Sequence, residues 1–460
     1  MKGAIAAGHP LTAEAGARIL ERGGNAVDAC VAAGFASWVT ESPLTGPGGG
    51  GFMLVHTARD RRTRVLDFFV AVPSGPLAEP EAVTVVFEGS QTQVFRIGPE
   101  SCAVPGTTAG LEAAHRAYGS LPWPDLVEAA VELADGGFEV TERQAFLHRI
   151  LAPMLLTTPC SGLETGERLA WPDLARTLER IARSGAAAIY SGDVARELVR
   201  AVPAITAADL EGYRVMRRRP LRSPYRGAEF VSNPPPSSGG VLIAYGLRQL
   251  EEPGRSGSPA AVALLARVME DQARARGRRL TRALGEVGGT THISVLDAAG
   301  NAAALSVSTG SGSNVVVPGT GVHMNNMLGE FDLAGTLPRP GERMTSMMSP
   351  SVLLEQGRPR LVLGSAGSSR LRGAVMQIVV NVLGHGLDVA NAIAAPRVHL
   401  EGEVLHLEPP LEPGEVPYEF ARWNERNLFF GGVSAVEQLP DGTLGAAGDP
   451  RRGGAGLVVL

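Results

Sequence analysis

The sequence predicts a protein of the mixed class (α/β, in its α+β form), with stacked β-sheets covered by helices. The first 150 residues are rich in alanine and arranged as helices interrupted by glycine, whereas alternating strand patterns dominate after residue 289. Runs of helix followed by runs of strand differ from regularly alternating βαβ units. They therefore favour packed sheets with the helices on the outside.

Residues 12–39, "TAEAGARILERGGNAVDACVAAGFASWV", predict two helices. The first ends at Gly23 and Gly24, and Asn25 is a good cap for the second because its side chain can accept from free backbone N–H groups. The loop "GPGGGG" precedes two short strands within "GFMLVHTARDRRTRVLDFFV". The other predicted helices cover 123–134, 171–183 and the segment after the prolines of "NPPPSSGG".

Two hairpins are predicted in the strand-rich half. Residues 291–309, "THISVLDAAGNAAALSVST", alternate with period two on both sides of a turn, and "PSVLLEQGRPRLVLG" repeats the pattern. "GSAGSSRLRGAVMQIVVNVLG" then predicts a strand, a tight turn and a helix. Residues 251–289 have little strand signal and end in "EVGG", so they are the best candidate for a linker.

Composition excludes several kinds of function. Lys2 is the only lysine, which excludes an internal lysine for a Schiff base, a Walker-type phosphate loop or a Ser–Lys dyad. The net charge of −5 is spread without basic or acidic blocks, so neither nucleic acid nor a membrane surface is an expected partner. The sequence contains no stretch of about 18 uninterrupted apolar residues, so no membrane-spanning helix is predicted. The N-terminal segment lacks the apolar core of a signal peptide, and a cytoplasmic location is expected.

The sequence predicts neither a metal site nor a cofactor site. Cys30, Cys102 and Cys160 are odd in number and widely spaced, so we expect reduced core residues. The nine histidines show no paired ligand spacing. "GPGGGG" lacks the GK[ST] ending of a phosphate loop and leads into a strand, which favours a backbone turn. There is also no G-x-S-x-G motif for a hydrolase serine.

Thr290 is the residue that suggests chemistry. A threonine hydroxyl needs a base, and a cut between Gly289 and Thr290 would place an α-amino group with a pKa of about 7.7–8.0 on the same residue. The preceding glycines would let the backbone bend so that the hydroxyl reaches its own upstream carbonyl. The alternative is a simple turn into a strand, since threonine favours β structure. Residue types alone favour that alternative.

Resemblance over nearly the whole chain changes the balance. Nine segments in the same order make the sequence similar to the γ-glutamyltranspeptidase family of N-terminal-nucleophile hydrolases. The resemblance implies a four-layer αββα sandwich made as one precursor. Self-cleavage would give a large chain, 1–289, and a small chain, 290–460, which together form one unit. The segments are "GHPLTAEAGARILERGGNAVDACVAA", "GPGGGGFMLV", "VPGTTAGLEAAHRAYG", "ITAADLEGYRV", "PPPSSGG", "GGTTHISVLDAAGNA", "HMNNMLGEFDL", "GSAGSSR" and "DGTLGAAGDPRRGGAG".

The resemblance also implies roles for individual residues. Thr290 would be the nucleophile in both self-cleavage and acyl transfer, and the cleaved bond would join Gly289 to Thr290. Ser308 takes the place of the family's second hydroxyl, a threonine, which hydrogen-bonds the nucleophile. The backbone N–H groups of Gly367 and Ser368 would form the oxyanion hole, although the family usually has glycine where Ser368 stands.

The expected substrate pocket departs from the family pattern. Phe69 stands where the family has an arginine that grips the substrate α-carboxylate, and phenylalanine cannot donate bidentate hydrogen bonds. The remaining positions implied for substrate binding are Gly310 (asparagine in the family), Met327 (glutamine or glutamate), Glu330 (aspartate), and Ser346 with Met347 (paired serines). These changes make the pocket more apolar. The span between "PPPSSGG" and "GGTTH" is also shorter than the family usually carries.

Three functions stay open at this point. The first is a self-processing γ-glutamyltranspeptidase-like enzyme that transfers a γ-glutamyl group, as from glutathione, to water, an amino acid or a peptide. The second is the same nucleophile acting on another acyl amide, as in cephalosporin-acylase-like relatives. The third is an unprocessed, non-catalytic relative. Both enzyme hypotheses imply a small-molecule amide substrate and two chains from one precursor.

Overall fold

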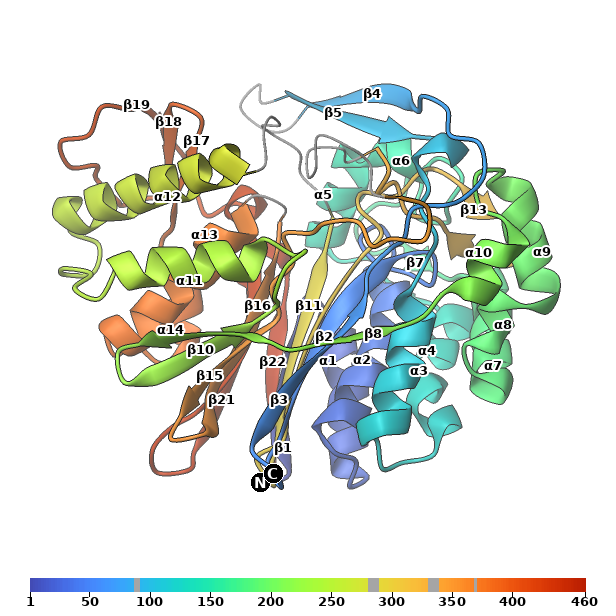
Figure 1. The fold of residues 1–460 in the computed structure, drawn as a ribbon, viewed down its shortest axis with the longest axis horizontal. Coiled ribbons are helices and arrows are strands. Elements are labelled where there is room, and N and C mark those ends of the chain that lie inside the picture. The colour runs from blue at the N-terminus through green and yellow to red at the C-terminus, as the bar shows by residue number, and fades with distance from the viewer. Residues whose placement is uncertain (87–91, 280–288, 330–338, 368–369) are drawn as a thin grey trace.

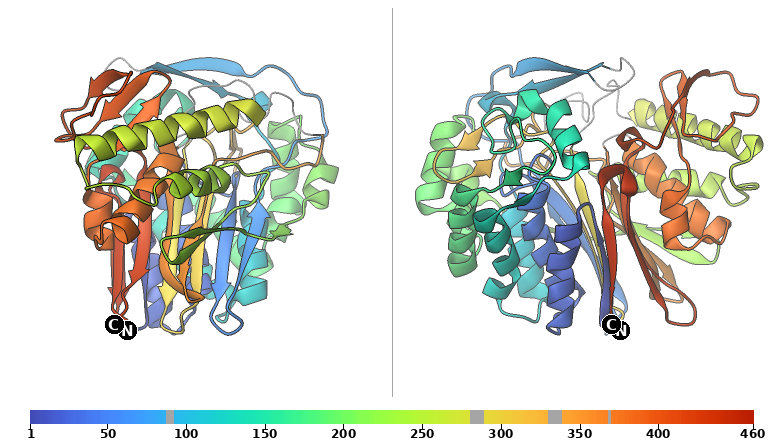
Figure 2. Two further views of the ribbon diagram at one scale, coloured as in Figure 1. Left: turned by 60° about the vertical axis from the view of Figure 1, so that its left-hand side comes forward. Right: turned by 180° about the vertical axis from the view of Figure 1, so that it is seen from behind.

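Two β-sheets pack face to face and carry helices on both outer faces (Figures 1 and 2). The computed structural model describes residues 1–86, 92–279, 289–329, 339–367 and 370–460. One sheet has seven strands and the other six. The mixed class and the αββα order of layers that the sequence predicts are therefore confirmed.

The seven-stranded sheet combines strands from both ends of the sequence, and all its neighbours are antiparallel. In spatial order its strands are β22 (Ala455–Val459), β1 (Gly3–Ala7), β11 (Thr291–Asp297), β12 (Ala302–Ser308), β2 (Gly50–Thr57), β3 (Arg62–Phe68) and β8 (Met216–Arg218). The six-stranded sheet contains β21 (Leu444–Gly448), β20 (Gly432–Gln438), β16 (Arg358–Ala366), β15 (Ser351–Glu355), β10 (Ala228–Ser232) and β9 (Leu221–Tyr225).

The helices form two outer layers. The seven-stranded sheet is covered by α1 (Pro10–Glu21), α2 (Ala26–Thr40) and α3 (Thr107–Tyr118), with α4 (Trp123–Gly136) and α7 (Pro172–Ser184) behind them. The six-stranded sheet is covered by α11 (Gly239–Gln249), α12 (Pro259–Arg279), α13 (Arg370–Val379) and α14 (Val389–Ala394).

Smaller elements complete the molecule. The short helices are α5 (Glu142–Ile150), α6 (Ala152–Leu155), α8 (Ala187–Tyr190), α9 (Gly192–Ala201) and α10 (Ala207–Gly212). The small sheets pair β4 (Glu81–Val86) with β5 (Thr92–Ile97), β6 (Phe138–Glu139) with β7 (Arg168–Leu169), and β13 (Val316–Val317) with β14 (Val322–His323). A fourth small sheet joins β17 (Val398–Glu401), β18 (Val404–Leu407) and β19 (Glu419–Arg422).

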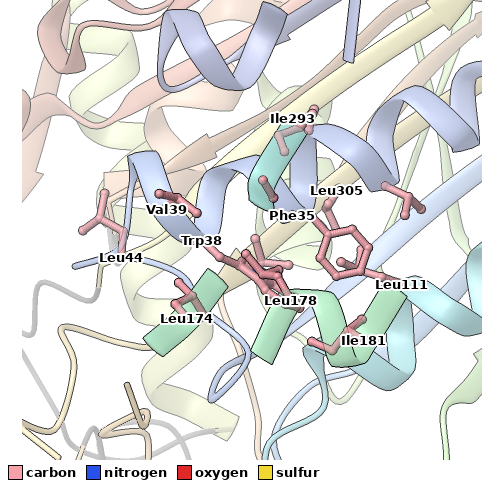
Figure 3. Close-up of a cluster of buried hydrophobic side chains, with 14 of the residues drawn as sticks. Phe35, Trp38, Val39, Leu44, Leu111, Leu174, Leu178, Ile181, Ile293 and Leu305 are labelled. Atoms are coloured by element: carbon pink, nitrogen blue, oxygen red, sulfur yellow. The ribbon is translucent and has the colours of Figure 1, made fainter. Parts of the chain in front are cut away.

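Each interface between layers has its own apolar core. The core between the seven-stranded sheet and its helices contains large side chains, among them Trp38 and Phe35 of α2 (Figure 3). The layer between the two sheets is built of alanine, valine and leucine side chains, including those of Ala4, Ala6 and Ala304. A separate cluster packs the six-stranded sheet against its helices. The two sheets pack directly against each other through this layer, so the strand ends of both sheets can contribute to one site.

Most of the predicted elements are confirmed, including both hairpins and the Asn25 cap, whose side chain accepts from the N–H groups of Val27 and Asp28. The linker prediction is wrong for residues 259–279, which form helix α12 and pack through Val262 and Ala266 into the core. Alanine and arginine favour helix there, so weak strand signal did not mean weak structure. Strand β1 was not predicted.

The three cysteines are buried and free of disulfides, as predicted. Within the described ranges, no helix combines the length and apolar character needed to cross a bilayer. The segment "GPGGGG" leads into strand β2, as predicted for a backbone turn.

Replacing Trp38 by alanine should destabilise the protein by about 3–5 kcal/mol, because its ring is 1% exposed and stands edge-on to Phe35 at 4.7 Å between ring centroids. Denaturant unfolding of the variant and the wild type measures the difference. Leu156, 65% exposed, supplies the control, and Leu156→Ala should change stability by less than about 0.5 kcal/mol. Equal effects from the two substitutions would contradict this assignment of the core.

Candidate active site

Thr290 lies directly before strand β11 and is buried, with 5% of its surface exposed. Side chains along a strand alternate between its two faces. His292 and Ser294 of β11 face the second sheet, where Ser294 Oγ donates to the carbonyl of Ser434 at 3.0 Å. Thr290 is two residues before His292, so its side chain points to the same face, toward the space between the two sheets.

Ser308 ends the neighbouring strand β12 and contacts the predicted cleavage site. Its hydroxyl donates a hydrogen bond to the carbonyl oxygen of Gly289, and the N–H of Gly310 donates to Ser308 Oγ at 2.8 Å. The family resemblance implied a bond between this hydroxyl and the nucleophile. In the intact chain the hydroxyl instead holds the carbonyl that the nucleophile would attack.

The glycine before Thr290 is required by close packing. A Cβ atom on Gly289 would collide with the carbonyl oxygen of Gly310 and stand 2.7 Å from Cδ2 of Leu44. Any side chain at residue 289 would therefore move the peptide bond between Gly289 and Thr290 away from Ser308. This explains why a residue without a side chain is placed against the threonine.

The described part of the predicted oxyanion loop lies beside the bond between Gly289 and Thr290. Gly367 follows β16 and has a φ of +125°, a conformation that favours glycine. A Cβ there would stand 3.9 Å from Nη2 of Arg452, whose Nη1 donates to the carbonyl of Thr290 at 3.3 Å. Gly367 is thus brought near Thr290, whereas Ser368 lies outside the described residues.

Those residues predicted to bind substrate that the structure describes do not line the cavity beside Thr290. Phe69 is 2% exposed and stacks on Phe52 at 5.5 Å, in the apolar cluster that also contains Met327. Ser346 and Met347 are buried against Ser237 and Ser238. Gly310 contacts Gly289 and Ser308, and Glu330 lies outside the described residues.

A buried carboxyl group that the sequence analysis missed holds β11 from the helical side. Glu41, which follows helix α2, accepts hydrogen bonds from Thr291 Oγ1 and from Thr12 Oγ1, the latter at 3.2 Å. Burial raises the pKa of Glu41 to about 7, against the lowering effect of both hydroxyls and of Arg452. Glu41 and Thr291 are 250 residues apart, so spacing in the sequence gave no signal for their contact.

The loop that carries Arg452 is fixed by buried ion pairs. Asp449 pairs with Arg397 at 2.6 Å and with Arg451 at 3.2 Å, and Arg451 also pairs with Glu408. A carboxylate oxygen of Asp449 accepts from the N–H of Val433 at 3.0 Å, which joins the loop to β20. Because every charge in this group has an opposite partner, its burial is tolerated and Arg452 is held next to Thr290.

Comparison with known proteins places the chain in a family. The sequence model described as "Gamma-glutamyltranspeptidase" matches residues 12–283 and 258–459. The chain belongs to the γ-glutamyltranspeptidase family. The two matched segments meet in the region that the sequence analysis judged to be shortened.

Curated relatives include two kinds of family member. The chain is 33% identical to the acylase ACY 1 proenzyme of Pseudomonas sp. strain V22, over all of this chain and 94% of the relative. It is 31% identical to the glutathione hydrolase proenzyme of Pseudomonas aeruginosa, over 99% of this chain and 94% of the relative. Both names denote enzymes made as precursors. The chain is accordingly an enzyme of this N-terminal-nucleophile family.

Solved structures agree on the fold. A cephalosporin acylase from Bacillus halodurans aligns over 99% of this chain and 95% of its own, with a TM-score of 0.79 and 22% identity. The γ-glutamyltranspeptidase of Helicobacter pylori aligns over 59% of this chain and 82% of its own, with a TM-score of 0.51 and 29% identity. The alignment with the cephalosporin acylase extends over nearly the whole chain, so the two proteins share one fold.

The free energy of unfolding of Glu41→Gln, measured relative to that of the wild type, should increase as the pH rises. In the unfolded chain a glutamate ionises near pH 4.3, whereas the pKa of Glu41 in the folded protein is about 7, so wild-type folding binds a proton between these values and loses stability as pH rises. The stability of Glu41→Gln relative to wild type should therefore increase by about 2–3 kcal/mol between pH 5 and pH 8.

Denaturant unfolding at several pH values measures this difference. Glu14→Gln is the matched control, because Glu14 is an exposed residue of the same helix that provides Thr12. Its stability relative to wild type should stay level over the same range. A level difference for Glu41→Gln as well would show that the buried carboxyl group titrates like a free one.

Proposed function

We propose that the protein cleaves itself between Gly289 and Thr290 and then uses Thr290 as the nucleophile of an amide acyl transfer. The proposal rests on one observation above all, the hydrogen bond from Ser308 to the carbonyl of Gly289. A donor on a carbonyl oxygen draws electron density from the carbon and stabilises the negative charge that develops when a nucleophile attacks. The hydroxyl of the next residue, Thr290, is that nucleophile.

The processing reaction needs only the groups of the chain itself and one water molecule. The Thr290 oxygen bonds to the carbonyl carbon of Gly289, the C–N bond breaks, and the nitrogen of Thr290 takes up the hydroxyl proton. Water then hydrolyses the ester, which leaves a carboxylate on Gly289 and frees both the hydroxyl and the α-amino group of Thr290. The products are a large chain, 1–289, and a small chain, 290–460.

The mature reaction repeats this chemistry on a separate amide. The α-amino group of Thr290, with an ordinary pKa of about 7.7–8.0, accepts the hydroxyl proton as the oxygen attacks the substrate carbonyl. The N–H of Gly367 is the proposed donor to the oxyanion, a contribution of about 3–4 kcal/mol in comparable enzymes. The amine half leaves with the proton, and water or a second amine then takes the acyl group from Thr290.

Thr290→Ala should abolish self-cleavage and leave one full-length band on a denaturing gel, because alanine has no attacking oxygen. Thr290→Ser is the matched control and should still give two bands, with the small chain beginning at residue 290 on N-terminal sequencing. Ser308→Ala should slow cleavage at least about tenfold by removing the donor to Gly289. Persistent full-length wild-type protein, or cleavage of Thr290→Ala, would refute the proposal.

The acyl group has two candidates. A γ-glutamyl group is the first, given the family and the glutathione hydrolase relatives. An apolar acyl group is the second, because the resemblance implies an arginine at residue 69 and a glutamine or glutamate at residue 327, where Phe69 and Met327 instead lie in an apolar cluster. Each hydrogen bond to a charged group that is missing costs about 1.5–3 kcal/mol of γ-glutamyl binding. The acylase relatives agree with this second candidate.

Three chromogenic substrates with one leaving group separate these candidates: the γ-glutamyl, glutaryl and hexanoyl 4-nitroanilides. The apolar surroundings of Phe69 predict a kcat/KM for the hexanoyl compound at least about tenfold above that for the γ-glutamyl compound. The opposite order would select γ-glutamyl transfer. Phe69→Arg is not a useful variant, because it would bury an unpaired guanidinium beside Phe52.

A further inference from the structure

A second cavity, of about 610 Å³, lies at the β8 edge of the seven-stranded sheet and is lined by residues of both β8 and helix α10 (Figure 1). It shares no lining residue with the cavity beside Thr290. Its volume falls in the usual range of small-molecule sites, about 300–1,000 Å³. Part of its wall is apolar and part is formed by arginines. These side chains include Val72, Val104, Met216, Arg214, Arg218 and Arg343.

Most of these arginines belong to a basic run in the sequence. Residues 214–222 contain five arginines, and no aspartate or glutamate occurs from residue 212 to residue 228. The sequence analysis found no basic block, because the net charge of the whole chain does not reveal this run. Within the described part of the chain, two of the five arginines have a carboxylate partner, and of these two Arg218 lines the cavity and pairs with Asp67. The run therefore brings more positive charge to this edge than nearby carboxylates neutralise.

Arg343 is a buried cation whose charge is only partly compensated. Its side chain is 8% exposed, and its Nε lies 3.6 Å from Oδ1 of Asp67 without a hydrogen bond among the described residues. The same carboxylate is held more closely by Arg218, whose Nε lies 2.6 Å from Oδ2. One buried carboxylate is therefore shared by two guanidinium groups. Because an unpaired buried charge is unfavourable, this arrangement favours the binding of a further anion.

Two neighbouring residues hold the Arg343 guanidinium at the cavity. Its Cζ lies 4.2 Å from the centroid of the Tyr213 ring, and its Nη2 donates to the carbonyl of Arg214. The Arg214 side chain is exposed, and its Nη1 donates to the backbone carbonyls of Glu211 and Tyr213. No carboxylate forms an ion pair with Arg214 in the part of the chain that the structure describes. A guanidinium that is already held in place loses little freedom when it binds an anion.

Two carboxylates also line the cavity, and both belong to exposed residues. Oδ2 of Asp209 accepts four hydrogen bonds, two from Ser74 and two from Thr206. Glu342 accepts from a backbone N–H at 3.0 Å. Because water screens exposed charges, these two carboxylates oppose a bound anion less than buried ones would. Behind them, the three cavity arginines and the single carboxylate of Asp67 leave an excess of two positive charges.

We propose that this cavity binds the phosphate group of a small organic phosphomonoester, with the organic part of the ligand against the apolar wall. A phosphomonoester carries a charge of about −1.5 to −2 near pH 7 and offers three acceptor oxygens. This charge matches the excess of two positive charges, and the planar donor fork of arginine suits phosphate oxygens. The site is separate from Thr290, so it does not depend on the proposed function.

Titration calorimetry with three aromatic probes tests the class of ligand. Phenyl phosphate, benzoate and phenol share a ring and carry a phosphate, a carboxylate and no charge near pH 7. Wild-type protein should bind phenyl phosphate at least about tenfold more tightly than benzoate, and phenol more weakly still. Benzoate or phenol binding as tightly as phenyl phosphate would overturn the assignment to a phosphate group. Absence of binding of phenyl phosphate at millimolar concentration would overturn the site itself.

Two variants test whether the arginines of this cavity hold the phosphate. Arg343→Gln should weaken the binding of phenyl phosphate at least about tenfold, because it removes a buried cation, and Arg214→Gln about threefold, because Arg214 is exposed. Thermal unfolding without ligand shows whether each variant keeps its fold. If Arg343→Gln does not fold, Arg214→Gln still decides, since an exposed side chain can be replaced without loss of the core. Unchanged affinity in either folded variant would overturn the proposal.

Arg217→Gln is the matched control. Arg217 precedes Arg218 in β8, is exposed, and lines a different cavity. Its replacement removes the same unit of charge from the same strand, yet it should change the affinity for phenyl phosphate less than about twofold. A loss as large as that in Arg214→Gln would show that the anion responds to the general charge of this edge, and the proposed site would be wrong.

Discussion

Strand β11 is tied to helix α2 at both ends, and the geometry of the site depends on this double attachment. Asp297, at the end of the strand, accepts from the N–H of Ala26 at the start of the helix at 3.0 Å. Glu41, just after the helix, accepts from Thr291 at the start of the strand. A 15-residue helix and a seven-residue strand are each about 23 Å long, so the two attachments are in register. These two attachments fix the position of β11 along helix α2, and with it the position of Thr290 at the start of the strand.

The interleaving of the strands allows the chain to be cut there without falling apart. In the seven-stranded sheet, β1 lies between β22 and β11, with backbone pairing on both sides. Residues before the proposed cut thus hydrogen-bond to residues after it along two complete strand edges, and β12 pairs with β2 in the same way. Since the sheets share one apolar interface, cleavage at residue 289 would remove a covalent bond from a structure that remains a single folding unit.

Glycine pairs, capping residues and period-two hairpins are local signals, and they predicted most of the elements around the site. They also drew attention to Thr290, although residue types alone favoured a simple turn there and only the family resemblance favoured a nucleophile. The sequence alone did not locate β1, since "GAIAA" is short, alanine-rich and buried on both faces, without the alternation that marks an edge or half-buried strand. The contacts of Glu41 and Arg452 with the Thr290 region join segments more than 150 residues apart, and no local pattern encodes them. The family resemblance implied roles for individual residues that local signals could not give, but only at positions where this sequence matches the family pattern.

The pairing of β22 with β1 has a further meaning for the topology of the molecule. The N–H of Lys2 donates to the carbonyl of Val459 at 2.8 Å, so the outer ends of these two antiparallel strands meet as the arms of a hairpin do (Figure 1). Joined by a short loop there and opened at residue 289, the polypeptide would follow the same path through both sheets as a circular permutant. Its first residue would be a threonine with a ready α-amino group, so the architecture does not itself demand that the nucleophile be released by self-cleavage.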